Sequence, residues 1–170
     1  MFLGQVLASL KKTTKIFYAA EICQFGIKKI ISASKVGSLQ EEWEPGAIVL
    51  LRDCIDMVHR DITLDDLGSD VADMTFPFDS NLCEIIKKSA EKAKINLGTD
   101  AVYVLSVNGS RLETPSEINL LRNMYSGKLV VGMIVPTEAQ LAKTLGIEYA
   151  ALSIVTNYAA GMRGEINKSI

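Results

Sequence analysis

Short apolar runs alternate with amphipathic stretches along most of this chain. Each run is long enough for a buried strand but too short for a helix of ordinary length. The predicted strands cover residues 27–34, 47–51, 101–107, 129–133 and 149–155. Apolar strands that alternate with amphipathic helices predict an α/β domain with a largely buried sheet.

The stretches between these strands carry helix signals. Thr114 and Glu117 have the spacing of a capping box, and Asn81 and Glu84 repeat it before a helix that is expected to end ahead of Gly98. The helix after Thr114 is expected to face the core with Ile118, Leu121 and Met124. Residues 1–26 are predicted to be helical, and residues 57–79, which show no period, to form a long surface excursion.

Residues 129–155 predict a strand, a helix and a second strand. Pro136 and Glu138 suit the first turn of the helix, where a missing N–H costs nothing and the helix dipole favours an anion. Gly146 suits the residue after the helix. This order predicts a parallel crossover unit, in which ligands bind just beyond the carboxyl ends of the strands.

Composition excludes several classes of protein. The 170 residues are 48% apolar and 22% charged with a net charge of −2, which indicates one globular domain without the basic face of a nucleic-acid binder. Three distant cysteines and the single His59 predict a reduced, cytoplasmic protein without a metal site. The apolar start, residues 1–10, is too short to span a membrane, so we expect no membrane partner.

Familiar catalytic motifs are absent from the sequence. The single histidine leaves no Ser-His-Asp or Cys-His arrangement, and no G-x-G-x-x-G or G-x-x-x-x-G-K loop occurs. The candidate residues are those predicted to follow the strands, and they are Ser34, Glu113, Met133, Thr156 and Asn157.

Four stretches, in order, resemble segments of the purine nucleoside phosphorylase family. Residues 108–118 resemble the segment G-P-R-F-E-T-P-x-E-I, and residues 132–150 resemble G-M-S-x-V-P-E-A-x-L-A-x-x-x-G-I-x-Y-A. Residues 156–161 resemble T-N-x-A-A-G. Residues 36–46 resemble the A-x-G-S-L and P-G segments of the methylthioadenosine phosphorylase branch. The resemblance implies a three-layer α/β domain whose central, mixed, mostly parallel sheet is flanked by helices.

The family cleaves a purine nucleoside with inorganic phosphate as co-substrate, and the resemblance implies no further cofactor. It implies phosphorolysis of a 6-oxopurine or methylthioadenosine-type nucleoside to free base and ribose 1-phosphate. Asn157 would be the catalytic residue, donating to N7 of the purine, and Glu113 would accept from its N1–H edge. The remaining implied contacts are Thr156 and Leu112 at the base, Met133 at the ribose, and Ser34 and Lys35 at the phosphate.

On sequence alone, purely structural roles for these residues stay open as alternatives. Asn157 is equally suited to satisfying a turn, Glu113 to a solvated loop and Met133 to the core. The sequence also departs from the family, because residues 1–26 match neither its first strand with a Gly-Ser-Gly phosphate loop nor its Arg-His element. Leu112 replaces the aromatic residue that stacks on the base.

These departures predict a single domain, residues 1–170, that lacks the family's phosphate loop and its C-terminal helix. The alternative to an active enzyme is a catalytically weak paralogue that serves as a purine-binding or structural subunit. In either case the resemblance implies a homo-oligomer, a trimer or hexamer, or assembly with a full-length relative.

Overall fold

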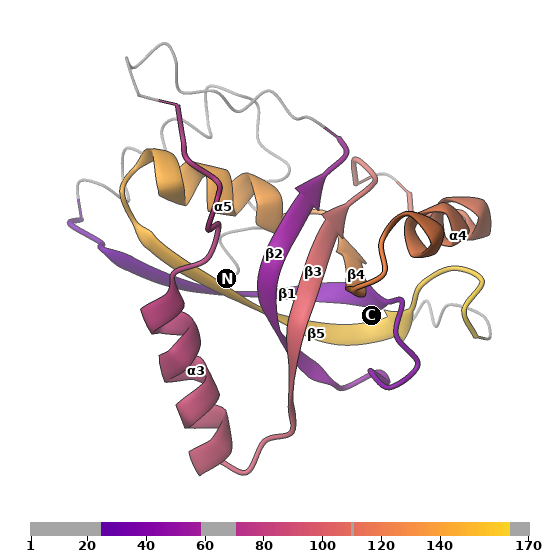
Figure 1. Cartoon of the computed structure of the whole chain (residues 1–170), viewed down its shortest axis with the longest axis horizontal. Coiled ribbons are helices and arrows are strands. Elements are labelled where there is room, and N and C mark those ends of the chain that lie inside the picture. The colour runs from indigo at the N-terminus through magenta and orange to yellow at the C-terminus, as the bar shows by residue number, and fades with distance from the viewer. Residues whose placement is uncertain (1–24, 59–70, 110, 164–170) are drawn as a thin grey trace.

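The computed structural model describes residues 25–58, 71–109 and 111–163 (Figure 1). These residues form five strands and three helices. The strands are β1 (Lys29–Ser38), β2 (Ile48–Asp56), β3 (Leu97–Leu105), β4 (Lys128–Gly132) and β5 (Glu148–Tyr158). The helices are α3 (Ser80–Lys92), α4 (Pro115–Met124) and α5 (Val135–Thr144). Most of the predicted helical stretch over residues 1–26 and most of the predicted excursion over residues 57–79 lie outside the described parts, at residues 1–24 and 59–70.

The five strands close into a barrel in the order β1-β4-β3-β2-β5. The pairs β1–β5, β2–β3 and β3–β4 are parallel, whereas β1–β4 and β2–β5 are antiparallel. Figure 1 shows the helices around this sheet. The α/β class and the mixed, mostly parallel sheet are therefore confirmed, with the sheet curled closed on itself.

The predicted parallel crossover over residues 129–155 is wrong. The strand, helix and strand exist as β4, α5 and β5, but β1 lies between the two strands in the described sheet. Because β1 is antiparallel to β4 and parallel to β5, these two strands run in opposite directions. An apolar run predicts a buried strand but carries no information about its partners.

Several strands run further than their apolar runs. β1 continues past Ser34 to Ser38, and β5 includes the polar residues Thr156 and Asn157, which were expected to follow it. Gly37 pairs with Asn157 in the β1–β5 ladder. The ladder satisfies the backbone groups of this segment, so its polar side chains do not end the strand.

Helix α4 begins as predicted. The Thr114 hydroxyl accepts a hydrogen bond from the Glu117 N–H, and the Glu117 carboxylate accepts one from the Thr114 N–H, which completes the capping box. Ile118 and Leu121 are buried, but the prediction for Met124 is wrong because its side chain is 68% exposed. It lies at the last residue of the helix, beyond the surface that the sheet covers.

Helix α3 begins earlier than predicted. Its N-cap is Asp79, whose carboxylate accepts from the Leu82 N–H at 2.8 Å, so Asn81 lies inside the helix. The helix ends at the C-cap Ala93, and Gly98 belongs to β3. No helix among the described residues is long and apolar enough to cross a membrane.

A buried carboxylate ties helix α5 to two strands. Glu138, in the first helical turn, accepts hydrogen bonds from the Ser32 hydroxyl of β1 at 2.8 Å and from the Tyr149 hydroxyl of β5 at 2.6 Å. Burial, and then the nearby Glu138 carboxylate, raise the pKa of Tyr149 well above its usual value, so this hydroxyl remains a donor. A buried carboxylate is tolerated only when it is hydrogen-bonded in this way.

We expect Tyr149→Phe to lower the free energy of unfolding by about 1–3 kcal/mol, because Glu138 loses one of its two hydroxyl donors while it stays buried. Urea denaturation followed by circular dichroism measures the change. Tyr158→Phe is the matched control, since the Tyr158 hydroxyl reaches only the exposed Glu41 carbonyl at 3.3 Å. Equal losses in the two variants would contradict the importance of the Glu138 contact.

Candidate functional site

The turn between β4 and α5 carries Met133, which is half-buried. The buried Tyr103 of β3 holds this turn, because its hydroxyl oxygen accepts from the Ile134 N–H at 3.2 Å. Burial raises the pKa of Tyr103 to about 12, so the hydroxyl stays protonated at neutral pH. A Cβ at Gly132 would lie 2.1 Å from that oxygen, so only glycine permits this approach. The predicted ribose contact therefore lies on a firmly held turn.

The carboxyl end of β1 brings three predicted segments together. A Cβ at Gly37 would meet Val131 Cγ2 of β4 at 3.2 Å and the amide nitrogen of Asn157 at 3.3 Å. It would also meet the Ala159 backbone at 3.5 Å, and the Ala159 N–H donates to the Ser38 carbonyl at 2.8 Å. The absence of a side chain at Gly37 thus lets the Asn157 amide lie against β1 beside β4.

Asn157 is oriented by its two neighbours in the chain. Its side-chain oxygen accepts from the Thr156 hydroxyl at 2.9 Å, and its amide nitrogen donates to the Tyr158 carbonyl at 2.8 Å. The side chain is half-buried, and an amide group has two N–H donors and two acceptor lone pairs. These contacts leave one donor and one lone pair for a ligand, while Thr156 supports the amide.

Glu113 lies between β3 and α4 and is buried at 9% exposure. The Ser106 hydroxyl, just after β3, donates to its Oε1 atom at 2.6 Å. Burial and this hydrogen bond exclude the interpretation of Glu113 as a solvated loop carboxylate. The adjacent Leu112, a predicted base contact, has a side chain that is 47% exposed.

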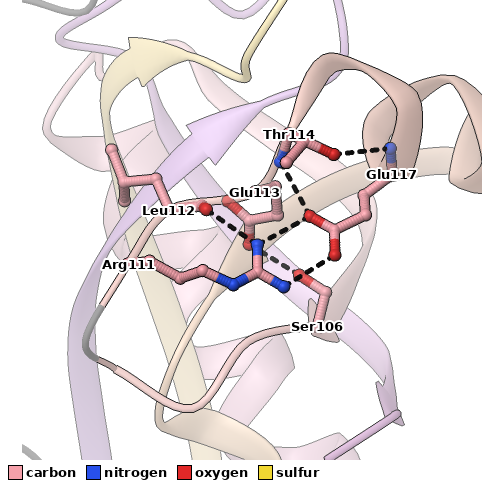
Figure 2. A network of polar contacts seen from close by, with 6 residues as sticks. All are labelled: Ser106, Arg111, Leu112, Glu113, Thr114 and Glu117. Carbon is pink, nitrogen blue, oxygen red and sulfur yellow. Dashed lines mark hydrogen bonds and ion pairs between the residues drawn. The ribbon is translucent and has the colours of Figure 1, made fainter.

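The ion pair between Arg111 and Glu117 lies beside Glu113 (Figure 2). Arg111 forks onto Glu117, with Nη1 2.8 Å from Oε2 and Nη2 2.7 Å from Oε1. The guanidinium, together with the Thr114 N–H, lowers the pKa of Glu117 to about 2, so the carboxyl is ionised at neutral pH.

Helix α4 connects Glu113 to the C-terminal end of β5. A buried cluster contains Ile118 and Leu121 of α4 together with Ala159, and Ala160 and Met162 pack against it. Figure 1 shows this yellow segment near α4. The segments that carry Gly37, Asn157 and α4 therefore meet on one side of the molecule.

The two predicted phosphate residues lie on opposite faces of β1. Ser34 is buried, and its hydroxyl lies 2.9 Å from that of Ser153. Lys35 is exposed. Because successive side chains of a strand point to opposite faces, these two residues do not converge on one ligand. His59 lies outside the described residues, and within them no group of three or more potential ligands could hold a metal ion.

Sequence reasoning missed two residues that organise this region. Ser106 is the one polar residue in the predicted strand over 101–107 apart from Tyr103, and that was a signal that it has a specific partner. Tyr103 lies within the apolar run, and its signal is that a buried tyrosine hydroxyl usually finds a hydrogen-bond partner.

The described residues thus offer a supported amide at Asn157 and a buried carboxylate at Glu113. The sequence profile of the Phosphorylase superfamily matches residues 13–168, and the chain belongs to this superfamily.

Curated relatives carry two related names. The chain is 38% identical over 154 residues to a probable S-methyl-5′-thioinosine phosphorylase of Thermodesulfovibrio yellowstonii, covering 87% of this chain and 57% of the relative. It is 39% identical over 163 residues to the 6-oxopurine nucleoside phosphorylase of Pyrococcus furiosus, covering 89% and 60%. The chain thus spans less than two thirds of the length of these relatives.

Solved structures confirm the fold. The purine nucleoside phosphorylase of Schistosoma mansoni superimposes with a TM-score of 0.80 at 24% identity, covering 96% of this chain and 62% of that one. The methylthioadenosine phosphorylase of the same organism gives 0.76 at 24% identity, covering 86% and 58%. The expected nucleoside phosphorylase-like fold is therefore confirmed.

We expect Gly37→Ala to destabilise the protein by about 1–3 kcal/mol, because the new methyl group overpacks the contact with Asn157 and Val131. Much of this cost should disappear in an Asn157→Ala background, where the amide is gone. Urea denaturation of the two single variants and the double variant measures the coupling. Additive losses would show that Gly37 and Asn157 are not in contact.

Proposed function

We propose that this chain is a purine nucleoside phosphorylase-like pentosyltransferase. Its reaction is phosphorolysis of a 6-oxopurine or methylthioadenosine-type nucleoside to free base and ribose 1-phosphate. The observation that carries the proposal is the pair of polar groups at the site, the Asn157 amide supported by Thr156 and the Glu113 carboxylate supported by Ser106. The names of the curated relatives support the same reaction class.

The roles of these residues follow from the charge that develops in the reaction. As the glycosidic bond breaks, the ribose gains oxocarbenium character and negative charge builds on the departing purine. A neutral amide that donates to N7 stabilises this charge without changing its own protonation state. Asn157 keeps one N–H for this contact, and Met133 on the β4–α5 turn packs beneath the ribose.

Glu113 selects the base in this proposal. A 6-oxopurine has a donor at N1, which matches the oxygen of Glu113 that Ser106 does not occupy. A 6-aminopurine has an acceptor at N1 and would leave a desolvated carboxylate facing a lone pair. Thr156 contributes by orienting Asn157, and Leu112 provides an apolar surface in place of an aromatic ring.

The phosphate side of the site is weaker. Ser34 faces inward beside Ser153 and Lys35 faces outward, so a single phosphate ion would gain a contact from one of them but not from both. A lone lysine is a point charge without the forked geometry of an arginine. This arrangement favours the second candidate, a catalytically weak purine-binding or structural subunit.

Assembly and location form part of the proposal. Ile31 of β1 and Ile154 of β5 expose 53% and 40% of their surfaces. Apolar side chains in such positions support a homo-oligomer, a trimer or hexamer, or association with a full-length relative. The free thiols of Cys54 and Cys83 support a cytoplasmic protein.

The purified chain should release hypoxanthine from inosine only when phosphate is present, and liquid chromatography of the free base measures this.

We expect 6-oxopurines to bind about tenfold to a few hundredfold more tightly than adenine, the equivalent of roughly 1–3 kcal/mol. Asn157→Asp should shift this preference toward adenine. Tighter binding of adenine or methylthioadenosine to the unmodified protein would contradict the assigned roles of Glu113 and Asn157.

Phosphate should bind more weakly than in the micromolar range, because the sequence lacks the family's glycine-rich loop and Arg-His element, whose charge-assisted hydrogen bonds are worth roughly 1.5–3 kcal/mol each. Titration calorimetry with inorganic phosphate measures the affinity. Lys35→Ala should remove the binding that remains, whereas Lys88→Ala on the exposed face of α3 should leave it unchanged. Low-micromolar phosphate binding would overturn this view of the site.

A further inference from the structure

Three contacts hold Glu113 in place. One is on its carboxylate, and the other two are on the peptide groups that flank it. The first is the Ser106 hydroxyl, which donates to Oε1 at 2.6 Å. The second is the peptide carbonyl of Leu112, the preceding residue, which accepts from Arg111 Nη1 at 3.0 Å. The third is the Thr114 N–H, in the following residue, which donates to Glu117 Oε2 at 2.7 Å. Figure 2 shows these contacts surrounding the Glu113 carboxylate.

One ion pair thus fixes the backbone on both sides of Glu113. The Arg111 guanidinium bonds both oxygens of Glu117 and also the Leu112 carbonyl, so each partner of the pair holds one flanking peptide group. A capping box alone explains the contact between Glu117 and Thr114 but not the fork from Arg111. The fork adds a fixed geometry, because a guanidinium matches a carboxylate with two parallel hydrogen bonds.

Exposed ion pairs contribute little to stability. The side chains of Arg111 and Glu117 are 53% and 38% exposed, so we expect this ion pair to fix the local geometry rather than to add stability. Ser106 adds a contact on the side chain itself, since its hydroxyl donates to Oε1 of Glu113 and does not occupy the other carboxylate oxygen. The rotation of the carboxylate and the position of its backbone are therefore set by separate contacts.

We infer that Ser106 and the Arg111–Glu117 pair are positioning residues that determine the purine selectivity of Glu113. This inference rests on the proposed function, in which Glu113 accepts from the N1–H of a 6-oxopurine. Ser106 fixes which carboxylate oxygen faces the base, and the ion pair fixes how far the carboxylate lies from it. Adenine gains nothing from either contact, because its N1 atom has no hydrogen to donate.

The first experiment measures hypoxanthine and adenine affinities by titration calorimetry with the full chain. We expect Ser106→Ala to weaken hypoxanthine about tenfold, the equivalent of roughly one net hydrogen bond, and to change adenine less than about twofold. Ser106→Thr, which keeps the hydroxyl, should restore hypoxanthine binding. Ser89→Ala is the matched control, because the Ser89 hydroxyl donates to a helix carbonyl of α3 at 2.7 Å, away from this network.

The second experiment leaves the Ser106 hydroxyl in place. Glu117→Gln keeps an acceptor for the Thr114 N–H but loses the charged fork from Arg111, and we expect hypoxanthine affinity to fall about threefold to tenfold. Glu84→Gln on α3 removes a similarly exposed ion pair, with Lys87, and should change neither affinity. Since the ion pair lies on the surface, this variant tests positioning even if Ser106→Ala unfolds.

The outcomes separate this inference from the proposed function. If the unmodified chain binds neither base, both are overturned. If it binds hypoxanthine but the Ser106 and Glu117 variants bind hypoxanthine equally well, only the positioning role is overturned. A parallel loss of hypoxanthine and adenine affinity would show that the contacts support the fold alone, and this would also overturn the inference.

Discussion

Strand β1 closes the barrel, and the rest of the site depends on this closure. It pairs in parallel with β5 over nearly its whole length and, at its carboxyl end, in an antiparallel direction with β4. Gly37 lies where the two ladders meet, so Asn157 of β5 comes to rest beside Val131 of β4. Without this shared strand, the amide and the turn that carries Met133 would belong to separate parts of the sheet.

Closure also explains which parts of the fold the sequence predicts. Apolar runs reveal strands because burial requires them, and the capping box at Thr114 reveals a helix start because its partners are three residues apart. The order and direction of β4, β1 and β5 depend instead on contacts between segments that are 92 to 120 residues apart. Strand ends were also misjudged, since the pairing of Gly37 with Asn157 carries β5 through polar residues.

The candidate site was predictable to a similar degree. Motif spacing identifies Asn157 and Glu113, whereas Ser106 is marked only as a polar residue in an apolar run, and its partner becomes evident only when the end of β3 meets the segment before α4. The separation of Ser34 from Lys35, by contrast, follows from the alternation of side chains once residue 35 is placed inside a strand. The error there came from ending the strand too early.

The residues proposed for base recognition differ in their geometry from those proposed for phosphate recognition. The contacts to Asn157 and Glu113 come from Thr156, Tyr158 and Ser106, all within the described residues, so these two proposed base contacts are oriented without a ligand. Preorganised groups lose little conformational freedom on binding, so less of their interaction energy is offset and more of it contributes to affinity. On the phosphate side, Ser34 and Lys35 diverge. In the proposed reaction, a chain built in this way would bind a purine independently of phosphate, and its turnover would depend on what completes the phosphate side.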